Sequence, residues 1–216
     1  MKAKLAYLAG LVAADGHLEK DGCGVSIYSN NRAFASVARK LLQEIVPTLR
    51  VRTYRSKGAW RIYVYSARLC TTLGKQFAIP MGKKSHRILF PRGLSKLESK
   101  RFVQGYVDGD GSFYMERRKR YGRVYLYPRV EVASQSKRFL QQLRAWLEDT
   151  GIACGQVHGG RRVFRLRVYA GNAAKFMLLI GFRHPNKAPL PPIPQAVDAA
   201  VQLDSTPGNS PGETAE

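Results

Sequence analysis

Two stretches of the chain share one pattern: YLAGLVAADG covers residues 7–16, and FVQGYVDGDG covers residues 102–111. Each is largely apolar, has a glycine in fourth place and ends in Asp-Gly. Alone, the first copy would suit a secretory signal peptide, because Lys2 and Lys4 precede an apolar run. The second copy lies in mid-chain between polar segments, so a signal peptide does not explain it.

The likeness between the two parts of the chain continues beyond this motif and keeps the same order. SNNRAFASVARKLL at 29–42 parallels SQSKRFLQQLRAWL at 134–147, and WRIYVYS at 60–66 parallels FRLRVYA at 164–170. The second part carries roughly ten extra residues, around ERRKRYGRVY at 116–125. The sequence therefore predicts a duplicated unit, with one half at 1–92, the other at 96–200, and a disordered tail at 204–216.

Within each half, the hydrophobic periodicity changes in a fixed order between helical and strand-like. This order predicts an αββαββα unit of the α+β class, with helices on one face of an antiparallel sheet. The expected helices are 2–14, 32–45, 67–77, 98–109, 137–149 and 171–180, and the strands located by pattern are 24–29, 51–55, 60–66, 124–134, 152–158 and 162–170. Gly151, just past one helix, is expected to end it.

The composition points to a polyanionic partner inside the cell. Lys and Arg number 36 against 15 Asp and Glu, a net charge of +21, which favours nucleic acid over a membrane surface. No apolar run approaches the roughly 20 residues of a membrane span. Cys23, Cys70 and Cys154 lie far apart, which favours a reducing compartment. We expect an intracellular protein of the cytoplasm, nucleoid or an organelle, not a secreted one.

The strands predict a sheet with one apolar face and one face of arginine and tyrosine. Inward-facing positions are Ile62, Val64, Val124, Leu126, Val130, Val132, Leu166 and Val168. A solvated face would more often carry Lys, Glu and Thr, whereas Arg and Tyr suit phosphates and base edges of DNA. The expected DNA-binding residues are Tyr28, Arg52, Arg61, Tyr63, Tyr65, Tyr125, Tyr127, Arg129, Arg165, Arg167 and Tyr169.

Small residues in the repeated motif predict close helix packing. Gly10 and Ala14 share one helical face, as do Gly105 and Gly109, so the two helix backbones can approach each other. Gly16 and Gly111 are expected to end these helices in the left-handed conformation.

Packing of this kind would bring Asp15 and Asp110 together at the helix ends. That arrangement is unfavourable on its own, since helix C-termini carry partial negative charge and carboxylates repel each other. Divalent cations would relieve both problems, and oxygen ligands suit Mg²⁺. Metal ions between carboxylates also serve phosphodiester cleavage. The alternative is an Asp-Gly turn that happens to occur twice.

These motifs resemble those of the LAGLIDADG homing endonucleases in their single-chain, two-motif form. LAGLVAADG at 8–16 departs from the family motif only at Val12 and Ala13, and VQGYVDGDG at 103–111 keeps Gly105, Asp108, Asp110 and Gly111. The resemblance covers about residues 4–194. It implies a monomeric saddle of two pseudo-symmetric halves whose antiparallel sheets face DNA. It also implies sequence-specific, metal-dependent double-strand breaks in a long pseudo-palindromic site.

The resemblance also implies roles for particular residues. Asp15 and Asp110 would be the catalytic acids sharing two or three Mg²⁺ ions, with the carbonyls of Ala14 and Gly109 as further ligands. Gln135 fits the place of a glutamine that orders water, and Asn30 is its shorter first-half counterpart. Lys187 and either Lys83 or Lys84, with Lys84 favoured by the repeat, fit the place of a basic residue that completes each site.

Two other functions stay open on the same scaffold. One is a maturase that binds intron RNA, and the other is a DNA-binding regulator without nuclease activity. Retention of Asp15 and Asp110 favours the nuclease over the regulator. The motif follows Met1 almost at once, which favours a free-standing or intron-encoded protein over an intein.

Overall fold

A computed structural model describes residues 1–187 of the chain. The end of the second predicted half, 188–200, and the tail at 204–216 lie outside the described residues. The first half consists of α1 (Lys2–Asp15), β1 (Gly16–Leu18), β2 (Gly24–Ser29), α2 (Arg32–Ile45), β3 (Arg52–Ser56), β4 (Ala59–Tyr65) and α3 (Ala67–Phe77). The second consists of α4 (Lys96–Asp110), β5 (Gly111–Arg120), β6 (Arg123–Ser134), α5 (Lys137–Asp149), β7 (His158–Gly159), β8 (Phe164–Tyr169) and α6 (Ala170–Leu179).

The two halves repeat the αββαββα order, which confirms the predicted fold class. Each forms a four-stranded antiparallel sheet, ordered β1-β2-β4-β3 in the first half and β5-β6-β8-β7 in the second. The second helices even begin alike, since Asn31 caps α2 through the Phe34 N–H and Ser136 caps α5 through the Phe139 N–H. The exact limits of 1–92 and 96–200 stay predictions.

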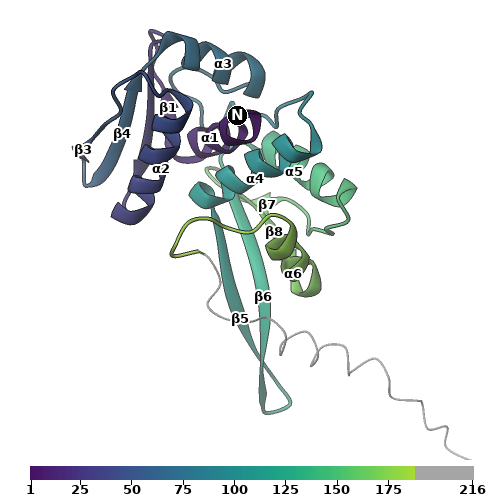
Figure 1. The fold of residues 1–216 in the computed structure, drawn as a ribbon. Coiled ribbons are helices and arrows are strands. Elements are labelled where there is room, and N and C mark those ends of the chain that lie inside the picture. The colour runs from purple at the N-terminus through teal and green to yellow at the C-terminus, as the bar shows by residue number, and fades with distance from the viewer. Residues whose placement is uncertain (188–216) are drawn as a thin grey trace, which may run out of the picture.

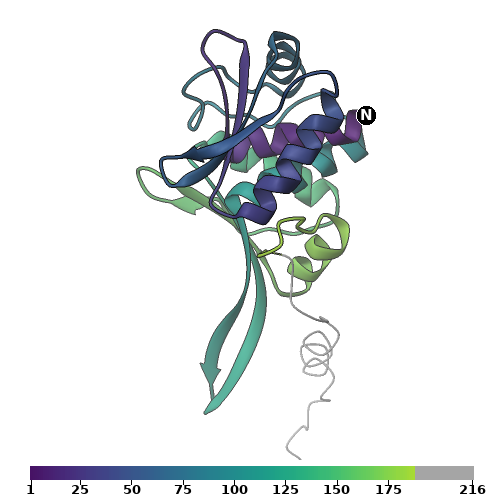
Figure 2. The same ribbon diagram turned by 60° about the vertical axis from the view of Figure 1, so that its left-hand side comes forward.

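Helices α1 and α4 lie side by side at the centre of the molecule (Figures 1 and 2). Glycine allows this approach. A Cβ on Gly10 would lie 2.7 Å from the Tyr106 nitrogen, and one on Gly105 would lie 3.0 Å from the Leu11 nitrogen and overlap the Tyr7 carbonyl. The predicted packing through small residues is therefore observed, and it fixes where both helices end.

The reason for glycine after each motif aspartate differs from the prediction. Gly16 has φ −104° and Gly111 has φ −102°, so neither residue is left-handed. Instead, a Cβ on Gly16 would lie 2.8 Å from the Ser26 oxygen, and one on Gly111 would lie 2.7 Å from the Val107 carbonyl. Close packing, not backbone handedness, requires these two glycines. Gly151, past α5, does adopt the left-handed conformation, with φ +80°.

The extra residues of the second half lengthen the β5–β6 hairpin, which leaves the body of the molecule (Figure 1). Val124 and Leu126 are therefore 52% and 51% exposed rather than inward as predicted, whereas Val130 and Val132 are buried. The expected strand at 152–158 is also mostly irregular. It keeps a bridge from Cys154 to Val168 and the short β7.

Within residues 1–187, no helix is both long and apolar enough to span a bilayer. The three cysteines are free thiols.

Candidate active site and nucleic-acid interface

Asp15 and Asp110 are the last residues of α1 and α4, so the central helix pair delivers both carboxylates to one place. Desolvation raises the pKa of Asp15, and Lys187 and Lys84 counter this in part. Desolvation, followed by the charge of Asp15, raises the pKa of Asp110 to about 6. The two lysines therefore compensate the negative charge of the pair only in part, as expected for a site that accepts a cation.

Two lysines reach the same helix ends. Lys84 Nζ donates to the carbonyls of Ala13 at 2.7 Å and Ala14 at 2.8 Å. Lys187 Nζ donates to the carbonyls of Asp108, at 2.8 Å, and Gly109. Both ammonium groups thus donate hydrogen bonds to carbonyls that have no partner within the helix. Ala14 and Gly109, the predicted carbonyl ligands, are each engaged by a lysine.

The site is built from both halves. Burial lowers the pKa of Lys84, and its strongest opposing charge is Asp110 of the other half. Burial also lowers the pKa of Lys187, which is opposed most strongly by Asp15. Lys84 is 7% exposed, whereas its neighbour Lys83 is exposed, so Lys84 is the lysine at the helix ends. Each lysine therefore donates to the central helix of its own half and interacts electrostatically with the aspartates of both halves.

Asp108 forms a hydrogen-bond network that was not predicted from the sequence. Its carboxylate accepts from the Tyr7 hydroxyl at 2.5 Å and from the backbone N–H groups of Arg183 and His184, both at 2.9 Å. Desolvation raises the pKa of Asp108 despite these three hydrogen bonds. The bonds tie the segment that carries Lys187 to both central helices. The one feature of the sequence that set Asp108 apart was that the first motif has Ala13, not an acid, at the equivalent position.

An open pocket of about 370 Å³ lies beside Asp15. Asn30 and Lys187 line it together with Gly109, His184 and Asn186, so several predicted site residues meet there. Gln135 is exposed immediately after β6, at the equivalent place of the second half, and lies outside this pocket.

The donor set can hold a hard cation. Within residues 1–187, no cluster of three or more His, Cys, Asp or Glu side chains could bind a metal, so two carboxylates are the side-chain ligands available here. The main-chain carbonyls of Ala14 and Gly109 offer further oxygen atoms, each of which also accepts a hydrogen bond from a lysine. Oxygen donors of this kind suit Mg²⁺ or Ca²⁺ rather than zinc, and the raised pKa of Asp110 fits a site completed by a cation.

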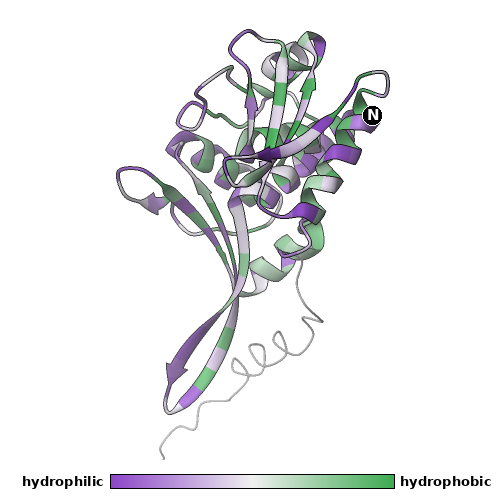
Figure 3. Ribbon diagram, turned by 90° about the vertical axis from the view of Figure 1, so that its left-hand side faces the viewer, coloured by the Kyte–Doolittle hydropathy of each residue, from purple (hydrophilic) through white to green (hydrophobic). Residues whose placement is uncertain are grey.

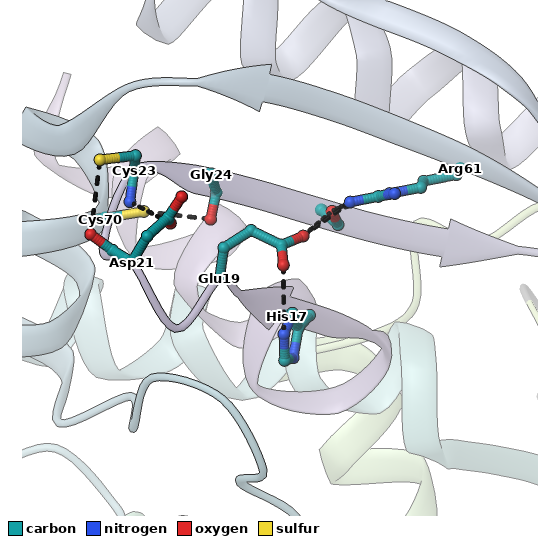
Figure 4. Close-up of polar contacts among 8 residues, drawn as sticks. His17, Glu19, Asp21, Cys23, Gly24, Arg61 and Cys70 are labelled. Atoms are coloured by element: carbon teal, nitrogen blue, oxygen red, sulfur yellow. Dashed lines mark hydrogen bonds and ion pairs between the residues drawn. The ribbon is translucent and has the colours of Figure 1, made fainter.

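The open face of the first sheet centres on Arg61. Its guanidinium donates to Glu19 at 2.6 Å and to Ser26 Oγ at 2.8 Å, and it lies 4.9 Å from the Tyr63 ring centroid. Glu19 also lies 3.6 Å from His17, and Figure 4 shows its carboxylate between the two basic side chains. The ion pair with Glu19 restrains the orientation of the Arg61 guanidinium on the open face of the sheet.

The second sheet repeats this arrangement. Arg129 donates to Glu116 at 2.6 Å, and Arg167 donates to Glu131 at 2.6 Å. Arg129 is only 6% exposed, so it is less available to DNA than expected. The other predicted contacts are at least partly exposed: Tyr28, Arg52, Arg61, Tyr63, Tyr65, Tyr125, Tyr127, Arg165, Arg167 and Tyr169. Three further residues on these faces were not predicted from the sequence: Glu19, Glu116 and Tyr54. Tyr54 pairs with Arg61 in register.

Known proteins share this sequence pattern. The LAGLIDADG-like domain family matches residues 2–76 and 98–181. The homing endonuclease I-ApeI of Aeropyrum pernix is 28% identical over 170 residues, which are 74% of this chain and 72% of I-ApeI. Elongation factor 2 of Methanopyrus kandleri is 28% identical over 187 residues, 85% of this chain, and the chain spans only 13% of that protein.

Solved structures share the fold. The I-DmoI complex with DNA and Mn has a TM-score of 0.60 at 17% identity, covering 83% of this chain and 97% of I-DmoI. Full-length DUF199/WhiA from Thermatoga maritima also has a TM-score of 0.60, at 16% identity, covering 96% of this chain and 62% of that one. At these identities the likeness concerns the fold. Because the family matches both halves over most of their length, the chain belongs to the LAGLIDADG-like domain family.

Proposed function

We propose that this protein is a homing endonuclease that makes Mg²⁺-dependent double-strand breaks at a specific, long and pseudo-palindromic DNA site. The observation that carries the proposal is the pairing of Asp15 and Asp110 at adjacent helix ends, each opposed by a lysine of the other half. The name of I-ApeI supports cleavage, and the I-DmoI complexes with DNA and Mn or Ca support divalent cations.

In this proposal, Asp15 and Asp110 hold two or three cations between them, together with the carbonyls of Ala14 and Gly109. The cations would supply charge neutralisation and water activation for phosphodiester hydrolysis. Lys84 and Lys187, whose ammonium groups lie at the two helix ends, would stabilise negative charge on phosphates that reach the site. Asn30 and Gln135 would orient water on the two sides.

The sheets would supply specificity. Both present arginine and tyrosine on one face, and the acids Glu19 and Glu131 orient Arg61 and Arg167 there. One monomer has two pseudo-symmetric halves, which suits a pseudo-palindromic site and one cut in each strand. A genomic DNA substrate implies action inside the cell.

Two alternatives remain distinct from this proposal. The same fold occurs in DUF199/WhiA, which is not named as an endonuclease, so the fold does not decide activity. A regulator would have no use for two crowded carboxylates, whose raised pKa values indicate an energetic cost. A maturase would bind intron RNA through the same basic faces, and it could coexist with cleavage.

The test uses the full chain and the intron-free allele of its host gene, with Mg²⁺ or with EDTA. Cleavage should require the metal. Asp15→Asn and Asp110→Asn should each abolish double-strand cleavage and leave DNA affinity within about threefold, a range that corresponds to less than 1 kcal/mol. Binding without cleavage by the unaltered protein would favour the regulator. Loss of binding in both variants would make the aspartates structural.

A further inference from the structure

The β5–β6 hairpin distinguishes the two halves. All ten residues of β5, Gly111–Arg120, pair with β6, whereas the three residues of β1, Gly16–Leu18, pair with β2. Figures 1 and 2 show the hairpin projecting well beyond the body of the molecule, with no counterpart at the first sheet. A projecting two-stranded ribbon is marginally stable in isolation, so its length needs a reason other than folding.

The end of the hairpin is strongly basic. Arg117, Arg118, Lys119, Arg120 and Arg123 are all exposed. The one acid of this segment, Glu116, is already engaged by Arg129 at 2.6 Å and by Arg118 at 3.0 Å. Figure 3 shows β5 as a mostly hydrophilic strand over its projecting part. Most of this charge therefore has no protein partner within residues 1–187 and is available to a polyanion.

The turn at the tip holds an aromatic residue in a costly conformation. Tyr121 has φ +49° and is 97% exposed, and Gly122 follows with φ +76°. Tight hairpin turns of this type favour Asn or Asp at the first position, because those residues tolerate positive φ better than an aromatic one. Tyr121 does not pack against the core, so packing does not offset the cost of its backbone conformation. Its exposed hydroxyl and ring therefore indicate a contact with an external ligand.

The back face of the hairpin is partly apolar, with Met115, Val124 and Leu126 exposed. Nothing in the described residues indicates a protein that covers it. The face that continues the open side of the sheet carries Arg118, Arg120, Arg123 and Tyr125, because these residues alternate in register with Tyr127 and Arg129. Charge and continuity both favour DNA over a protein partner.

We infer that the hairpin tip, residues 117–124, is a one-sided DNA contact in which the Tyr121 hydroxyl donates to a backbone phosphate beyond the sheets. This inference rests on the proposed function and adds that the protein covers more DNA on one side of the cut than on the other. The paired part of β5 exceeds that of β1 by seven residues. At about 3.3 Å per residue and 3.4 Å per base pair, the extra reach is at most about 7 base pairs.

The experiment is hydroxyl-radical footprinting of the target, with Asp110→Asn as background so that the DNA stays intact. Protection should extend further from the centre of the pseudo-palindrome on one side. A shortened hairpin, in which Asn-Gly replaces residues 119–124, lacks two paired residues of β5 and should lose about 2 base pairs of that extra protection. Its salt dependence of binding should fall by about 2 to 3 in log–log slope, because three basic residues are removed. In the cleavage-competent background, the cut positions should not move.

Two point variants separate contact from folding. Tyr121→Phe keeps the ring and should weaken DNA binding by about tenfold, the effect of losing one hydrogen bond to a charged group. Tyr121→Asn should weaken binding similarly while its melting temperature stays equal or rises, because Asn suits this turn. A purely structural role for Tyr121 predicts no loss of affinity in the Asn variant.

The outcomes separate this inference from the proposed function. A protein that cuts DNA but gives a symmetric footprint, or keeps the full protection on the long side after shortening, overturns the hairpin contact alone. An uneven footprint without any cleavage supports the contact and removes the nuclease. A shortened protein that changes only its oligomeric state or its RNA affinity assigns the hairpin to another partner. Failure to bind any DNA overturns both.

Discussion

At the residue scale, three aspartates in the last turns of α1 and α4 have different surroundings. Asp108 is saturated by three donors, whereas Asp15 and Asp110 face each other at the ends of two helices. A saturated carboxylate stabilises the fold, and a crowded one weakens it in exchange for a cation site. Opposite effects on stability are therefore expected when each kind is removed.

Asp110→Asn should stabilise the metal-free protein at pH 8. The folded-state pKa of Asp110 is about 6, above its ordinary value of 3.8, so the folded state binds more protons between pH 4 and 6. The stability of the wild type should therefore be fully present below about pH 4 and fall as the pH rises through 6. The variant lacks this loss and should gain about 1–3 kcal/mol at pH 8. Urea denaturation at several pH values, in EDTA, measures both curves. A variant less stable than wild type at pH 8 would contradict the crowding argument.

Asp108→Ala should destabilise the protein by about 3 kcal/mol, because it strands the Tyr7 hydroxyl and two backbone N–H groups. Asp149→Ala, at the exposed end of α5, is the control and should change stability by less than about 0.5 kcal/mol. Thermal and urea denaturation of both variants provide the comparison. Equal effects would show that the Asp108 bonds contribute little.

At the scale of elements, the helix pair positions the two aspartates, and the sheets position the outward-facing arginines. Glycine at the α1–α4 contact lets the two backbones touch, so the ends of both helices, and their aspartates, converge. The alternation of β4 and β8 then keeps apolar residues under the helices and arginines outside. Loss of a glycine at the helix contact should therefore reduce stability, and loss of an outward arginine should reduce DNA binding.

Gly105→Ala should cost more than 3 kcal/mol or prevent folding, because the added Cβ would overlap the Tyr7 carbonyl and lie 3.0 Å from the Leu11 nitrogen. Gly74→Ala is the matched control within helix α3. Its Cβ would meet only the Ile79 carbonyl, at 3.7 Å, and alanine should stabilise that helix by up to about 1 kcal/mol. The denaturation midpoints of the two variants measure this difference. Equal midpoints would contradict the close packing of α1 against α4.

Arg167→Ala should cost about 1–3 kcal/mol of binding at particular base pairs, because Glu131 holds this arginine in a fixed orientation on the sheet. The same is expected of Arg61→Ala. Binding to a set of single-base-pair variants of the target measures the effect, and Lys75→Ala in α3, on the helical side, should change nothing. A uniform loss over all sequences would make the arginines phosphate contacts instead.

At the scale of the whole molecule, charge is the dominant property. The chain has a net charge of +21, and arginines lie on both sheets and, on one side only, on a projecting hairpin. A saddle-shaped contact along a duplex would neutralise many phosphates, and each one releases counterions.

DNA affinity should therefore fall steeply with salt. For 6–10 neutralised phosphates, the dissociation constant should rise by about 10³ to 10⁵ between 50 and 200 mM salt. Fluorescence anisotropy with labelled target DNA over a salt series gives the slope. A nearly flat response would mean that the basic faces do not lie along the duplex.

Features that depend on local patterns could be predicted from the sequence alone. Period-two alternation placed Ile62 and Arg61 on opposite faces of β4, and the repeated Gly and Asp placed two like helices together with acids at their ends. Such features follow from backbone geometry within a few residues. The sequence also marked the extra residues of the second half, without showing that they project as a hairpin.

Contacts between groups far apart in the chain could be identified only from the three-dimensional fold. The bonds from Lys84 to Ala14 and from Lys187 to Gly109 join residues 70 and 78 positions apart. The role of Asp108 depends likewise on Tyr7, 101 positions away. Hydrogen bonds depend on distance and direction in space, which a pattern along the chain does not specify. The conformations of Gly16 and Gly111 differ from expectation for the same reason, since packing against distant atoms sets them.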